Sequence, residues 1–247
     1  MAKLRFFPLF IFLCASAAAQ NVKDSCIKVP LVGLHLSAQL PGGDLVDRFG
    51  INGNVGLPFY YKTKKNILIG GEFNYFFGHK LKVDIFANLR TPEGSITNSD
   101  GNPGNVRIQE RGWSITACIG KIFAAGPNKN SGVIILAGAG YMQHKINISD
   151  LGRNLAQING EYKKGYDKLT GGPMLSQFIG YFYLSNNRLA NFIAGFEFFE
   201  GFTRGLRGYQ FDTMSSDDKR RIDILSGARI GWILPIYKRT PKDFYSN

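Results

Sequence analysis

The chain has 247 residues, a formal net charge of +12 and a mean hydropathy of −0.10. Beyond an N-terminal apolar run, the longest unbroken stretch of apolar residues and glycine covers about ten positions, Val133 to Met142, which is too short for a transmembrane helix. No Pro- or Ser-rich linker and no internal repeat divides the chain, so we expect one domain. A mean hydropathy near zero fits a soluble protein, but it also fits a transmembrane β-barrel, because lipid-facing and lumen-facing residues cancel in the average.

The first 19 residues have the features of a secretory signal peptide. Lys3 and Arg5 precede an apolar run that ends at Cys14, and the small residues up to Ala19 offer an A-x-A cleavage site. We therefore expect residues 1–19 to be removed and residues 20–247 to be exported as a basic domain.

Alternation of apolar with polar or small residues predicts about eight strands. In the first strand, for example, Leu34 and Leu36 alternate with His35 and Ser37, which gives the strand one apolar face. Segments rich in Gly, Pro and Asn separate the strands. The predicted strands cover residues 30–40, 51–61, 67–78, 111–121, 133–145, 173–184, 189–202 and 221–237.

The last predicted strand is compatible with two folds, a soluble sandwich and a transmembrane barrel. Its apolar face runs from Ile222 to Ile236 with Ser226 as an interruption, and its other face carries Asp223 and Arg229. In a soluble sandwich the apolar face would meet a core. In a transmembrane barrel it would meet lipid, and the charged face would meet a polar lumen.

The connections between strands favour the barrel. Those after the second, fourth and sixth strands are short to moderate, whereas the others include the three longest. Outer-membrane barrels have an even number of strands, short periplasmic turns and longer extracellular loops. We therefore predict an all-β protein: a closed antiparallel up-and-down transmembrane β-barrel of about eight strands in the bacterial outer membrane, with both mature termini in the periplasm.

Outward-facing aromatic residues sort into two groups when the chain is threaded up and down. Two such belts are typical of the interfaces of a bilayer, whereas a soluble sandwich gives no reason to sort aromatic residues by height. We expect an extracellular belt of Phe77, Trp113, Tyr141 and Phe198, and a periplasmic belt of Phe59, Tyr61, Tyr181, Tyr183 and Trp232.

A barrel of about eight strands has a lumen that side chains fill. Charges that face this polar lumen must be paired, because an isolated buried charge is costly. We predict an ion-pair network of Glu72, Glu197, Arg111 and Arg229, with Asp223, His35 and His144 as further polar partners.

Two cysteines remain in the exported chain, Cys26 and Cys118. Export makes a disulfide between them chemically possible. Two unpaired, inert thiols are the alternative, because a bond also requires suitable geometry.

The sequence carries no clear catalytic or metal-binding signature. His79 and His144 fall near the expected extracellular rim, with Asp84 or Asp150 as candidate acidic partners, but their spacing does not indicate a base in reach of a partner. No HExxH, paired CxxC or EF-hand spacing is present. We expect no metal and no cofactor.

Basic residues in the loops have two interpretations. Lys163, Lys164, Lys168, Arg204 and Arg207 either contact anionic lipopolysaccharide or are ordinary solvated charges. A protein partner is a further candidate, through the extracellular loops, where Gly160–Leu169 is rich in Tyr and Lys, or through the periplasmic tail. Nucleic acid is not expected as a partner, because the chain is exported and its cations are scattered.

The strands containing GAGY and AGFEF, together with the closing segment GWILPIYKR, resemble the small outer-membrane β-barrels of Bacteroidota-type Gram-negative bacteria, with OmpA/OmpX-like architecture. The tail Lys238–Asn247 after the last strand departs from this resemblance. The resemblance implies a structural or interaction role: membrane integrity, adhesion, or service to an assembly or secretion machine. The alternatives are an outer-membrane enzyme acting on lipid or peptide at the extracellular rim, a narrow small-molecule transporter, and a soluble lipocalin-like barrel.

Overall fold

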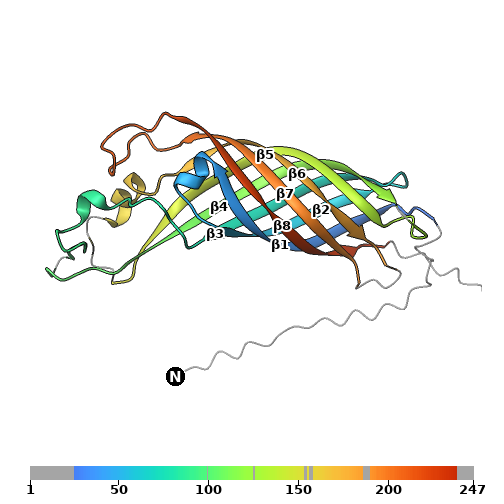
Figure 1. The fold of residues 1–247 in the computed structure, drawn as a ribbon, viewed down its shortest axis with the longest axis horizontal. Coiled ribbons are helices and arrows are strands. Elements are labelled where there is room, and N and C mark those ends of the chain that lie inside the picture. The colour runs from blue at the N-terminus through green and yellow to red at the C-terminus, as the bar shows by residue number, and fades with distance from the viewer. Residues whose placement is uncertain are drawn as a thin grey trace, which may run out of the picture.

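The protein is a single closed barrel. The computed structural model describes residues 25–98, 100–124, 126–152, 155, 158–185 and 190–237. Eight strands pair in chain order, each antiparallel to the next, and β1 pairs with β8 to close the ring (Figure 1). This confirms the predicted up-and-down barrel. The predicted signal peptide, Leu189 at the predicted start of the seventh strand, and the tail after residue 237 lie outside the described residues.

The strands are β1 (Val29–Gly43), β2 (Asn52–Lys62), β3 (Ile67–Gly78), β4 (Val106–Ala124), β5 (Gly132–Asp150), β6 (Thr170–Tyr183), β7 (Phe192–Gly205) and β8 (Arg220–Pro235). Three short 3-10 helices, η1 (Asp44–Asp47), η2 (Ala87–Leu89) and η4 (Gly160–Gly165), lie in the longer connections. Within the described ranges, no helix is long and apolar enough to cross a membrane. We call the end with these helices the loop end, and the end where β1 begins and β8 ends the terminal end (Figure 1).

Two strands, β4 and β5, extend furthest beyond the predicted bounds at the loop end. β4 begins at residue 106 rather than 111, and β5 continues to residue 150 rather than 145. In these extensions the polarity of the two faces reverses: Ile146 and Ile148 point inward and are buried, whereas Arg107 points outward and is exposed, as does Lys145 at the predicted end of β5. The extensions therefore have the polarity of a soluble barrel rather than that of a membrane barrel.

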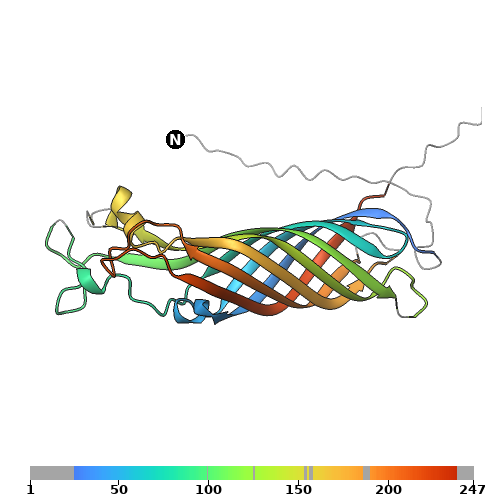
Figure 2. The same ribbon diagram turned by 90° about the horizontal axis from the view of Figure 1, so that it is seen from above.

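The strands are strongly staggered around the ring (Figure 2). A row of directly paired residues can be traced once around the barrel. It starts at Val32 on β1 and returns to β1 at Gly42, ten positions further along. The row passes through Phe59, Gly71, Ala117, Ala139, Leu175, Glu200 and Ile224. Strand number and stagger together set the tilt and the diameter, and a barrel of about eight strands is just wide enough for side chains to fill.

An apolar band surrounds the outside of the barrel. Outward side chains on every strand are large, apolar and open to the surroundings, for example Leu36 (54% exposed), Ile119 (58%), Phe196 (61%) and Ile230 (65%). A continuous band of this kind on a closed barrel is the surface that meets lipid. The polar residues Gln177, Glu200 and Ser226 also point outward, and nothing in the structure explains their presence there.

The interior has three layers. At the terminal end, an apolar cluster includes Leu68, Ile122 and Phe182. At the loop end, a second apolar cluster includes Phe49 and Phe199. Charged and amide side chains lie between them. The expectation of a polar lumen is therefore correct only for the middle layer. At the loop end the lumen continues into the strand extensions, where the alternation places apolar residues inside, and at the terminal end inward positions of the strands themselves carry apolar side chains.

Candidate functional sites in the lumen and at the loop end

The middle layer is built around Arg229 of β8. Its Nη1 and Nη2 lie 2.8 and 2.9 Å from the two carboxylate oxygens of Glu72 on β3, and its Nε lies 2.6 Å from Glu197 on β7. The guanidinium also lies 5.0 Å from the centre of the Phe178 ring. All three charged residues are buried. The structure thus brings together three of the four residues of the predicted ion-pair network.

Neutral side chains complete this network. The Tyr60 hydroxyl donates to Glu72, and Gln39 Nε2 donates to Glu197 at 2.5 Å. A ring nitrogen of His35 lies 3.0 Å from Asn74 Oδ1, so His35 contacts an amide rather than an ion. Tyr60, Gln39 and Asn74 were not among the predicted residues, although the period of two places them on the inward faces of their strands.

The fourth predicted member, Arg111, is a correction. It faces outward on β4, because a period of two puts it on the same face as Trp113. Its guanidinium donates to Gln109 Oε1 at 2.6 Å and to the carbonyl oxygen of Glu110 at 2.8 Å. The inward charge at this level is Glu110, to which Asn52 Nδ2 donates at 3.1 Å.

A second network lies nearer to the loop end, around Asp223. Arg48 Nη2 and a ring nitrogen of His144 lie 3.0 and 2.9 Å from this carboxylate, and Thr203 donates to it at 2.5 Å. Arg48, which follows η1, also donates to Thr170 at 2.9 Å. Burial lowers the pKa of the Arg48 guanidinium from its ordinary value, and the Asp223 carboxylate opposes this. Asp223 and His144 thus form a site separate from Arg229, and the sequence pattern missed Arg48 because it lies in a loop.

The histidine and acid pairs considered for catalysis are not brought together. His144 is 2% exposed and contacts Asp223 rather than Asp150. His79 Nδ1 lies 2.7 Å from Gln109, whereas Asp84 pairs with Arg90. Among the residues that the structure describes, no cluster of His, Cys, Asp and Glu has the form of a metal site.

The two cysteines are free thiols. Cys118 points into the lumen from β4 and is buried, whereas Cys26 precedes β1 and donates to the carbonyl oxygen of Lys129 at 3.4 Å. The structure therefore agrees with the alternative of two unpaired cysteines.

The predicted belt residues all lie on the outward faces of their strands: Phe77, Trp113, Tyr141, Phe198, Phe59, Tyr61, Tyr181, Tyr183 and Trp232. Phe77, next to the last residue of β3, is close to the loop end, and the Trp113 and Tyr141 rings are 5.8 Å apart. Phe198 lies in the middle of β7, and Phe202, four residues further along, is nearer to the loop end. At the terminal end, Tyr183 stacks on Phe192 at 5.0 Å.

Most of the predicted loop cations have acidic partners within the chain. Arg207 pairs with Asp167, Lys168 with Asp212, and Lys164 with Glu161, at 2.5, 2.5 and 2.6 Å. In the described part of the chain, no carboxylate pairs with Lys163 or Arg204. The first two pairs link the β5–β6 connection to the β7–β8 connection, so these cations stabilise the loops.

The long connections fold together into one unit, which we call the cap: the described residues of 44–51, 79–105, 151–169 and 206–219. Phe86, Tyr166 and Phe211 come from three different connections, and Tyr166 lies 5.6 Å from Phe86 and 5.5 Å from Phe211, ring centre to ring centre. Phe211 N donates to the Gly165 carbonyl oxygen at 2.9 Å, and Gly50 N donates to that of Lys80 at 2.8 Å. All four loop-end connections are therefore tied to one another.

The cap exposes an apolar surface. Tyr162 (63% exposed) and Tyr209 (47%) both pack against Phe211, and Met214 (66%) lies in the turn that follows it. We call these four residues the cap patch.

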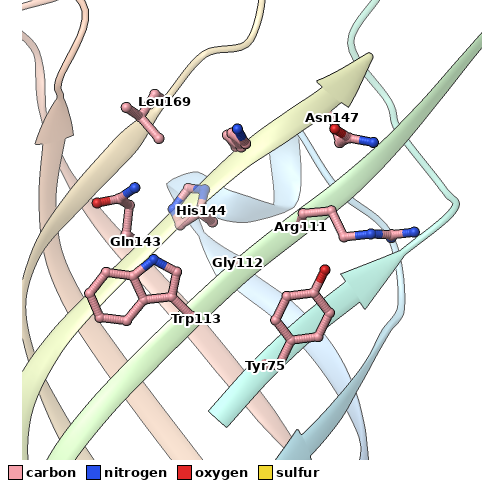
Figure 3. A pocket seen from close by; sticks show the side chains of 9 residues that line it. Tyr75, Arg111, Gly112, Trp113, Gln143, His144, Asn147 and Leu169 are labelled. Carbon is pink, nitrogen blue, oxygen red and sulfur yellow. The ribbon is translucent and has the colours of Figure 1, made fainter. Parts of the chain in front are cut away.

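A hollow of about 390 Å³ lies outside the barrel wall, below the cap (Figure 3). Tyr75 of β3 and Trp113 of β4 line its lower part, and Arg111 and Asn147 lie on the side of the loops. Lys145 also lines it.

No family model and no curated protein matches the sequence. Among solved structures, the chain is similar to Neisserial surface protein A, at 11% identity and a TM-score of 0.44, over 84% of this chain and 97% of the other. It is also similar to Ail, the attachment invasion locus protein of Yersinia pestis, at 10% identity and a TM-score of 0.42, over 84% and 100%. A third similar structure is the N-terminal β-barrel domain of Pseudomonas aeruginosa OprF, at 12% identity and a TM-score of 0.35, over 82% and 97%.

The chain has the architecture of a small eight-stranded membrane-spanning barrel, as the resemblance of its sequence implied. The fold follows from the chain's own strand pairing and apolar band. The Bacteroidota part of that resemblance stays a prediction.

Proposed function

We propose that the protein is an integral outer-membrane barrel that presents its cap outside the cell as a binding surface for a protein partner. The observation that carries this proposal is the cap patch, which consists of three exposed side chains and the half-buried Phe211 on loops that are folded against one another. Short turns at the terminal end and long connections at the loop end support the orientation, because outer-membrane barrels have their longer loops outside.

The composition of the patch fits protein recognition. Tyrosine, phenylalanine and methionine are enriched at protein interfaces, and tyrosine is frequent among the residues that contribute most to binding. Loops that are already ordered lose little conformational entropy when a partner binds. The hydrogen bonds and ion pairs between the cap connections provide this order.

The interior favours this role over that of a transporter. Apolar clusters fill both ends of the lumen, and buried ion pairs fill the layer between them. A solute would have to displace packed side chains at each layer. Adhesion and service to an assembly or secretion machine are two forms of the proposed role, and the identity of the partner distinguishes them.

Site-specific photocrosslinking in intact cells tests the proposal. A photoreactive amino acid replaces Tyr162 or Tyr209 in the cap patch, and Glu93 in the β3–β4 connection provides the matched exposed control. We expect a discrete protein adduct from the two patch positions and none from position 93.

A second measurement uses the substitutions Tyr162→Ser and Met214→Ser together, with Glu93→Ser as the control. With the photoreactive amino acid at position 209, the patch variant should lose the protein adduct, and it should still migrate as a folded barrel on unheated gels. Equal adducts at patch and control positions, or a partner retained by the patch variant, would contradict the proposal.

A further inference from the structure

Two cations oppose each other across β4 and β5 on the outside of the barrel. Arg111 and Lys145 are direct partners in the antiparallel ladder. Side chains at such positions have Cβ atoms about 4.5–5.5 Å apart, and like charges there destabilise a sheet. Among the described residues, no carboxylate lies within 4.0 Å of either cation, and the Arg111 guanidinium donates only to neutral oxygens. An anion from outside the chain would neutralise this pair.

The pair lies directly beside the apolar band. In the ladder, Phe77, Arg111 and Lys145 form one row. The next row toward the terminal end is Tyr75, Trp113 and Gln143, and the row after that is Phe73, Ile115 and Tyr141. Tryptophan and tyrosine in a membrane protein mark the level of the lipid headgroups. The cations are therefore at or just above headgroup level.

The hollow at this position has two kinds of lining (Figure 3). Aromatic rings of Tyr75 and Trp113 line the side that continues into the apolar band, and Arg111, Lys145 and Asn147 supply cations and an amide toward the loops. This arrangement fits a ligand with an anionic head and apolar chains. A small soluble anion would leave the aromatic part of the hollow unused.

The same arrangement occurs a second time. Arg204 and Arg220 are direct partners across β7 and β8, and Phe202 and Ile222 form the next pair toward the terminal end. All four line another hollow, of about 750 Å³. Asp44 also lines it, but its carboxylate accepts from Ile222 N at 2.8 Å and lies 3.5 Å from Lys219 Nζ.

We propose that the Arg111–Lys145 pair binds the phosphate of a phosphorylated glycolipid in the outer leaflet, with the acyl chains of this lipid on the aromatic and apolar band below. Two cations match the charge of a phosphate monoester, and charged hydrogen bonds to phosphate are the strong ones. The site is separate from the cap patch, so the barrel would bind lipid at its wall and protein at its cap.

Trp113 provides a local measurement of binding. The chain contains two tryptophans, so Trp232→Phe leaves Trp113, in the hollow, as the reporter. The full chain is reconstituted in phosphatidylcholine vesicles with increasing amounts of diphosphoryl lipid A, and Trp113 emission is followed. We expect a saturable change in emission that Arg111→Gln with Lys145→Gln weakens by about tenfold or more.

Matched controls separate the site from general charge and from other ligands. Arg107→Gln with Lys163→Gln removes the same charge elsewhere and should leave binding unchanged, and Arg111→Lys with Lys145→Arg should retain it. Because Arg111 and Lys145 point outward, all variants should fold, which heat-modifiable gel migration checks. The proposal is overturned if the site variant equals the charge control, if lipid A without phosphates binds equally well, or if inorganic phosphate alone produces the same saturable change.

Discussion

Arg229 neutralises two carboxylates in the middle of the lumen. Removal of one member of a buried ion pair leaves an uncompensated buried charge, which costs about 3–5 kcal/mol. We therefore expect Arg229→Met to lower the free energy of unfolding by about this amount, since Glu72 and Glu197 would lose their cation. Urea-induced unfolding in lipid vesicles, followed by migration on unheated gels, measures the change.

Two comparisons make this test specific. Arg107→Met, at an exposed outward position of β4, should leave the unfolding midpoint nearly unchanged. Arg229→Met combined with Glu72→Gln and Glu197→Gln should recover part of the lost stability, because no buried charge then remains unpaired. Equal midpoints for Arg229→Met and Arg107→Met would mean that the lumenal charges do not depend on each other.

The period of two predicted three of the lumenal charges correctly. Glu72, Glu197 and Arg229 lie on inward faces of clear strands, and the structure brings them together. The prediction for Arg111 was wrong, because Arg111 and Trp113 are two residues apart on β4 and therefore both face outward. Arg48 was missed for a different reason: a loop has no period, so nothing in the sequence shows which loop side chain enters the lumen.

At the level of the strand, hydrophobic alternation predicted the membrane-crossing parts of the strands but not the loop-end extensions of β4 and β5. A pattern search for apolar outward faces stops where β4 and β5 leave the bilayer, since their apolar residues there point inward. The cap could not be predicted at all, because its core comes from residues of three connections that are far apart in the chain. Its formation depends on packing between loops rather than on any local pattern.

The η1 segment lies in the mouth of the barrel, where the buried side chain of Arg48 holds it. Arg48 donates to Asp223 and Thr170, and Leu45 and Phe49 are fully buried. Hydrogen bonds to charged groups contribute about 1.5–3 kcal/mol. We expect Arg48→Ala to increase amide hydrogen exchange in residues 44–50 by about ten- to a hundredfold, while β2 and β3 keep their protection.

Lys219→Ala provides the matched control for this element, because Lys219 reaches Asp44 from the surface at 3.5 Å. The Ile222 N–H that donates to Asp44 already holds the pKa of this carboxyl below its ordinary value. Because Asp44 keeps its 2.8 Å hydrogen bond from Ile222 N when Lys219 is removed, Lys219→Ala should change the exchange of residues 44–50 little. If both variants exchange equally, the buried contacts of Arg48 do not anchor the segment.

The barrel wall has one apolar face, but this face points in different directions along the length of the barrel. In the middle of the barrel this face meets lipid and the lumen contains ion pairs. Toward the loop end it turns inward and is continuous with the core of the cap. The cap is thus an extension of the barrel wall rather than a set of independent loops, which explains how long connections can present an ordered surface.

The difference between the capped loop end and the terminal end gives a prediction about the orientation of the barrel in the membrane. Gly101, in a connection of the cap, and Gly126, in a turn of the terminal end, have φ of +80° and +94°, and a Cβ added at either would meet nothing within 4 Å. A short epitope inserted after either residue should leave the barrel intact, because exposed turns tolerate insertions. In intact cells, antibody should label the epitope after residue 101, whereas the epitope after residue 126 should be labelled only when the outer membrane is permeabilised. The reverse labelling would place the cap in the periplasm, where neither the proposed surface partner nor the outer-leaflet lipid could reach it, and equal labelling of both would show that the barrel does not span the membrane in one direction.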